Sequence, residues 1–73
     1  MPRYFFNVLD GENRPDPDGE ELADDEAARR SAVAVIFETL REHSAYVVKG
    51  GPFSVVVTNG VGQEIWRLTV QGR

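Results

Sequence analysis

The stretch DDEAARRSAVAVIFETLREH, residues 24–43, decides the fold because it has the composition and spacing of one long amphipathic helix. Asp24 suits the N-cap, and two further acids stand in the first turn, where they favour the positive end of the helix dipole. At about 100° per residue, one arc gathers the predicted buried face: Ala28, Ala32, Val35, Ile36, Thr39, Leu40 and His43. We therefore predict a helix over residues 25–43 that packs one side on the rest of the chain.

Beyond this helix, Gly50, Gly51 and Pro52 are typical of a helix stop. The segment 44–49 before them is compatible with either helix or loop. Tyr46 and Val47 continue the apolar arc, whereas the two valines of the segment weaken its helix propensity. Both interpretations stay open at the level of the sequence.

Alternating apolar residues on both sides of the helix predict β-strands. RYFFNVL at 3–9, FSVVVTN at 53–59 and EIWRLTV at 64–70 all have the period of two that a half-buried strand requires. The glycine-rich NGVGQ joins the last two strands as a hairpin turn. The side chains predicted to face the helix are Tyr4, Phe6, Val8, Phe53, Val55, Val57, Trp66, Leu68 and Val70.

After the turn dipeptide Asp10-Gly11, the segment ENRPDPDGEEL at 12–22 is predicted to pair back on the first strand. Pro15 and Pro17 lack the N–H donors that a central strand needs. We therefore expect an edge strand that is short or broken. The order strand, strand, helix, strand, strand predicts an α+β fold, in which a mainly antiparallel sheet of about four strands carries one long helix on one face.

Size and cysteine content limit the possibilities further. The 73 residues are expected to form a single domain, residues 1–73, because so short a chain has one core at most. The chain has no cysteine, which excludes disulfide bonds and thiolate metal sites and favours a cytoplasmic location. No segment approaches the roughly 18 apolar residues that span a bilayer, so we expect no membrane association.

The net charge of −4, from 12 acidic and 8 basic residues, disfavours binding to a phosphate backbone. The basic residues are also spread along the chain. An open sheet face could still stack bases, with Arg3, Phe5 and Arg67 as the contacts. Nucleic-acid binding is therefore kept as the alternative function.

Neither a metal site nor a catalytic site is indicated. Asp16, Asp18 and Gly19 match part of the calcium-loop pattern, but Arg14 occupies its first ligand position. Asp18-Gly19 is better interpreted as a turn. His43 is the only histidine, and we expect it to interact with the negative end of the helix dipole. We accordingly expect no enzyme activity, no cofactor and no metal.

The helix is apolar nearly all round between residues 31 and 40. Val33 and Phe37 lie beyond the arc that one sheet can cover, and Ala34 extends this surface. One exposed phenylalanine is common in proteins, but Val33, Phe37, Ala34 and Arg41 could also meet their counterparts in a second copy. Because domains this small gain little from their own core, self-association is favoured.

We therefore predict a small, non-enzymatic interaction or regulatory module that forms a dimer or binds an unidentified protein. A strand-edge dimer, through the terminal hairpin or the first strand, is the competing geometry.

Several short motifs run along nearly the whole chain. They are the MPRYFF opening, the DG turn, the D-x-x-G-x-E-L pattern at Asp16, Gly19, Glu21 and Leu22, the EAARR helix opening and the terminal hairpin. Together they resemble a family of small bacterial single-domain proteins of unknown function with an M-P-x-Y-F-[FY] opening. The resemblance implies a ββαββ fold and supplies no catalytic residues. The prolines of the second strand depart from the family pattern, which has β-formers there.

Overall fold

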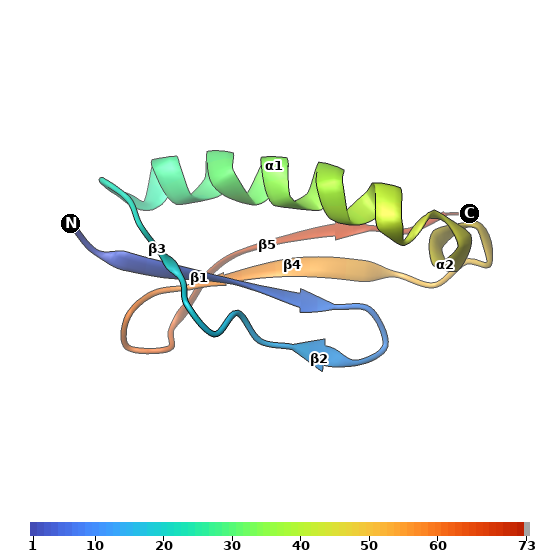
Figure 1. Cartoon of the computed structure of the whole chain (residues 1–73), viewed down its shortest axis with the longest axis horizontal. Coiled ribbons are helices and arrows are strands. Elements are labelled where there is room, and N and C mark those ends of the chain that lie inside the picture. The colour runs from blue at the N-terminus through green and yellow to red at the C-terminus, as the bar shows by residue number, and fades with distance from the viewer. Residues whose placement is uncertain (73) are drawn as a thin grey trace.

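The computed structural model describes residues 1–72 and confirms the predicted α+β fold. A five-stranded antiparallel sheet has the order β2-β1-β4-β5, with β3 also paired to β1. The strands are β1 (Arg3–Leu9), β2 (Asn13–Arg14), β3 (Glu20–Glu21), β4 (Phe53–Thr58) and β5 (Glu64–Val70). Figure 1 shows α1 (Asp25–Glu42) lying along one side of this sheet, with α2 (Ser44–Val48) at its C-terminal end.

The core lies between α1 and the side of the sheet that faces it. Its buried side chains are Tyr4, Phe6, Ala28, Ala32, Ile36, Phe53, Val55 and Val57. The other side chains predicted to point inward, Val8, Trp66, Leu68 and Val70, are partly buried against this cluster. Two fully buried alanines on α1 let the helix approach the sheet closely. Strand alternation therefore predicted these residues correctly, while Ile65, next to the register shift between Val57 and Thr58, also packs against the cluster.

The start of α1 is held by two side-chain hydrogen bonds. Asp24 is the N-cap, as predicted, and its Oδ1 accepts a hydrogen bond from the Ala27 amide at 2.9 Å. One residue on, Asp25 Oδ1 accepts a hydrogen bond from the Tyr4 hydroxyl at 2.7 Å. This hydrogen bond, together with burial, raises the pKa of Tyr4 to about 12. The beginning of α1 is thereby tied to β1.

The predicted edge strand is broken, as the prolines indicated. β2 pairs with Val8 and Leu9, and β3 pairs with Arg3 and Tyr4, while the span between β2 and β3 contains both prolines. Over that span, Asp16 Oδ2 accepts a hydrogen bond from the Phe6 amide at 3.1 Å. The outer edge of β1 is therefore covered by backbone and by one carboxylate.

The open question over residues 44–49 is answered by a second short helix. α1 ends at Glu42 with His43 as its C-cap, α2 covers Ser44–Val48, and Lys49 caps α2. Gly50 follows with φ of 88°, a conformation that favours glycine. The chain then returns into β4, the central strand, which pairs with both β1 and β5.

Candidate interaction surface

The side of α1 that faces away from the sheet carries a continuous line of exposed residues, which we call the outward stripe. Its members follow one another at spacings of three and four residues: Glu26, Arg30, Val33, Phe37 and Arg41, with Ala34 beside them. Phe37 is 66% exposed and Val33 is 37% exposed. All four residues predicted for an interface thus lie on one face. Glu26 and Arg30 were not in that prediction, although the same spacing identifies them.

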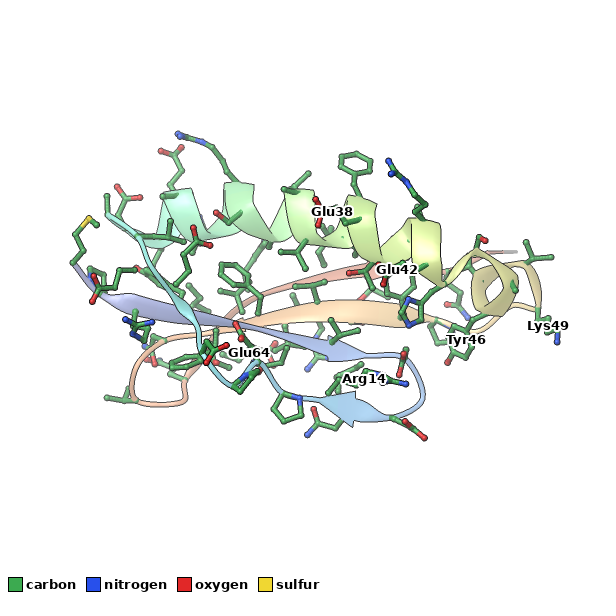
Figure 2. The ribbon with its side chains drawn as sticks, viewed as in Figure 1. Arg14, Glu38, Glu42, Tyr46, Lys49 and Glu64 are labelled. Carbon is green, nitrogen blue, oxygen red and sulfur yellow. The ribbon has the colours of Figure 1, made fainter. Side chains whose placement is uncertain are left out.

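The charged residues of the outward stripe lie towards its two ends and flank an apolar centre. Glu26 lies in the first turn and Arg41 in the last turn, where each sign favours the nearby end of the helix dipole. Between them, Arg30 Nη2 donates a hydrogen bond to Glu26 Oε2 at 3.0 Å. The stripe therefore begins with an ion pair, has an apolar centre and ends in a basic residue. Figure 2 shows side chains that project from α1 away from the sheet.

On the opposite face of the sheet, the basic residues considered for nucleic-acid binding are paired with carboxylates. Arg3 Nη2 lies 3.4 Å from Glu21 Oε1. Arg67 donates to both oxygens of Glu64, at 2.9 and 3.2 Å, and this pairing lowers the pKa of Glu64. The third residue, Phe5, is half-buried. This face therefore has its positive charges engaged within the protein.

A shallow groove of about 420 Å³ crosses the same face, lined by Asn7, Leu9, Asn13, Pro15, Val56 and Arg67. The side-chain amide of Asn7 already forms hydrogen bonds within the protein. Asn7 Nδ2 donates to the carbonyl oxygen of Val56 at 3.1 Å and to Thr58 Oγ1 at 3.2 Å, and Asn7 Oδ1 accepts from the Asp16 amide at 2.9 Å. The groove therefore does not gather free polar groups around a ligand.

His43, predicted to lie at the end of the helix, does so and also contacts the β1–β2 turn. Its Nδ1 lies 2.9 Å from the Thr39 carbonyl oxygen, and its Nε2 lies 2.7 Å from Asp10 Oδ2. Both ring nitrogens face oxygen acceptors, so both contacts are hydrogen bonds only when the ring carries two protons. The ring also stacks on Phe53, with centroids 5.7 Å apart. His43 thus links the end of α1 to the β1–β2 turn and to β4.

Asp10 is the partner of His43 that sequence reasoning missed. Its carboxylate is nearly buried, with 5% of the side chain exposed, and it also accepts from Arg14 Nε at 3.0 Å. Burial raises the pKa of Asp10, but hydrogen bonds from His43, the Glu12 amide and Arg14 outweigh this effect, so its pKa lies below the ordinary value. Figure 2 shows Arg14 at the same end of the molecule as Tyr46 of α2. The cluster joins the hairpin turn to the end of α1.

Asp16, considered as part of a calcium loop, uses its carboxylate to bind backbone amides. It accepts hydrogen bonds from Phe6 and Asp18 at 3.1 Å each and from Gly19 at 3.2 Å. Burial raises the pKa of Asp16, but these three hydrogen bonds outweigh it and hold the pKa below its ordinary value. Gly19 has φ of 71°, as the predicted turn requires. The acidic segment thus forms a hydrogen-bonded turn.

Within residues 1–72, no three His, Cys, Asp or Glu side chains are placed together so that they could hold a metal ion. In the same part of the chain, neither helix combines the length and the apolar character needed to cross a membrane.

These observations define the class of protein as a small α+β domain with one helix layer and an exposed apolar centre on that helix. The family model described as Domain of unknown function (DUF6894) matches residues 3–71, and the chain belongs to this family. The resemblance to a family of unknown function is thereby confirmed. Comparison with curated proteins gave no match, and comparison with solved structures gave none.

Proposed function

We propose that this protein is a small interaction module that self-associates as a homodimer through the outward stripe of α1. The observation that carries the proposal is the 66% exposure of Phe37 beside Val33, on a helix whose other side already covers the sheet. Each Å² of apolar surface removed from water contributes about 25 cal/mol, so contact between two such stripes is favourable. Bacterial origin and a cytoplasmic location stay predictions from the sequence.

The shape of the chain supports this proposal. The molecule is elongated, with extents of 39 × 20 × 17 Å, and it exposes 4821 Å² of surface. A compact monomer of this mass exposes about 4500 Å². In a chain below about 70–80 residues, the core rarely contributes more than about 3–5 kcal/mol to the free energy of unfolding. Surface buried in a dimer therefore adds to a small stability.

The competing strand-edge geometry is restricted by the sheet. The outer edge of β1 is covered by β2, Asp16 and β3, so the first strand does not offer an edge. Within residues 1–72, the outer edge of β5 has no neighbouring strand. Pairing between two β5 edges is therefore the alternative that an experiment must separate from contact through α1.

Light scattering on the purified full-length protein tests the proposal. We expect wild type to have twice the 8.1 kDa mass of one chain and Phe37→Lys to have 8.1 kDa. Val61→Lys is the matched control, because Val61 is 87% exposed but lies in the β4–β5 turn, and this variant should stay dimeric. A wild-type monomer at high micromolar concentration rejects the proposal. If Phe37→Lys is still a dimer, the interface is not the outward stripe, and pairing of two β5 edges becomes the preferred geometry.

A further inference from the structure

We propose that the two α1 helices pair antiparallel, with the two-fold axis passing between Val33 of one copy and the partner's Ala34. This inference rests on the proposed self-association and adds its geometry. Three residues from this centre along each helix, Arg30 lies opposite the partner's Phe37. Four residues beyond that pair, Glu26 lies opposite the partner's Arg41. Because the axis is two-fold, each of these contacts occurs twice.

The chemistry of each opposed pair is favourable. Glu26 and the partner's Arg41 have opposite charge, and both are exposed at the two ends of the stripe. Arg30 lies across from an exposed aromatic ring, a geometry that allows a cation–π contact. Its hydrogen bond to Glu26, at 3.0 Å, already orients the guanidinium. At the centre, Val33 meets an alanine, which is small enough for the helices to approach within about 8–10 Å.

Other arrangements of the same stripe bring like charges together or lose the pairing. A parallel dimer places Glu26, Arg30 and Arg41 each opposite its own counterpart and also aligns the two helix dipoles. An antiparallel dimer centred on Phe37 moves Glu26 past the end of the partner's α1, which stops at Glu42. Centring the axis between Val33 and Ala34 is the arrangement that gives charge complementarity.

The fold leaves room for this contact. Figure 1 shows α1 as an outer layer of the described chain, with the sheet on one side of it only. α2 and the β1–β2 turn lie at one end of α1 and do not cover the stripe. A second helix can therefore lie along α1 over the whole distance from Glu26 to Arg41.

A charge-reversal experiment tests the register. Glu26→Arg alone and Arg41→Glu alone should each weaken self-association about tenfold, because each places like charges opposite one another twice. Mixed in equal amounts, the two variants should associate as wild type does, since both opposed pairs are then complementary. Sedimentation of each variant and of the mixture gives the dissociation constants. Lys49→Glu, an exposed charge change outside the stripe, is the control and should have no effect.

The outcomes separate the register from the proposed function. If wild type is a dimer and the mixture is no tighter than the single variants, the antiparallel register is wrong while self-association stands. If wild type is a monomer, both proposals fail. Far-UV circular dichroism of each variant shows whether α1 has kept its helix content.

Cysteine cross-linking gives a second test that does not depend on charge, and the natural chain has no cysteine to interfere. Ala34→Cys should form a disulfide-linked dimer on mild oxidation, because position 34 lies beside the two-fold axis. Arg41→Cys should not, because its counterpart lies about 22 Å away along the antiparallel pair. Efficient cross-linking at both positions indicates parallel helices and overturns the inference.

Discussion

At the scale of single residues, Asp16 shows how one side chain can stand in for a stretch of strand. Pro15 and Pro17 flank it and have no amide hydrogen to donate, so a regular strand cannot form here. The Asp16 carboxylate instead accepts a hydrogen bond from the Phe6 amide of β1. It also accepts hydrogen bonds from the amides of Asp18 and Gly19, which form the turn that follows it. The first acid of the D-x-x-G pattern is therefore structural, and β1 keeps its hydrogen bonding where the strand is interrupted.

Asp16→Ala should lower the free energy of unfolding by about 1–3 kcal/mol, because the part-buried Phe6 amide loses its acceptor. Urea denaturation measures this loss. Asp18→Ala, two residues along and exposed, is the matched control and should change stability by less than about 0.5 kcal/mol. Equal losses in the two variants would show that the carboxylate of Asp16 does not hold the edge.

The same residue predicts a pH dependence. The folded pKa of Asp16 lies below its unfolded value, so its contribution to stability is complete above about pH 4 and is lost as the pH falls through the folded pKa. The stability difference between wild type and Asp16→Asn should therefore be largest near neutral pH and shrink in acid. Urea midpoints at neutral and acidic pH measure it. A difference that stays constant would contradict the assignment.

At the scale of elements, local patterns predicted most of the fold. Alternation at Phe53 and Val55, and the helical arc through Ile36, each follow from a period that a short window of sequence contains. The contact between Asp10 and His43 could not be predicted, because it joins residues 33 positions apart. The exposure of Phe37 followed from the helical arc, because residues beyond the width that one sheet covers lie on the outer side of the helix.

The turn from α2 into β4 depends on a glycine that makes room for a ring. A Cβ atom on Gly51 would lie 2.5 Å from the Tyr46 ring, closer than such atoms approach. Gly51→Ala should therefore destabilise the protein by about 1–3 kcal/mol through overpacking. Gly60→Ala is the control, since its Cβ would meet its nearest neighbour at 3.9 Å, an ordinary contact. Thermal or urea denaturation compares the two variants, and equal stability would show that Tyr46 can move aside.

At the scale of the whole molecule, the two edges of the sheet differ. The β1 edge is covered along much of its length, whereas within residues 1–72 β5 pairs on one side only and β4 pairs on both. Amide hydrogen exchange should therefore be slow throughout β4 but alternate along β5, because every second amide of an edge strand points to solvent. Uniform protection of β5 would show that a second chain covers this edge.

The open edge of β5 is also the place where aggregation of the protein is expected to start. If two copies join through their α1 helices, the resulting particle still carries two uncovered strands, one on each copy. Those strands can template further chains when the protein is crowded or partly unfolded, since β5 contains no proline and only the charges of Glu64 and Arg67 oppose such pairing. Fibrils, if they form, should therefore begin at Glu64–Val70 and spread outward from that side of the sheet alone.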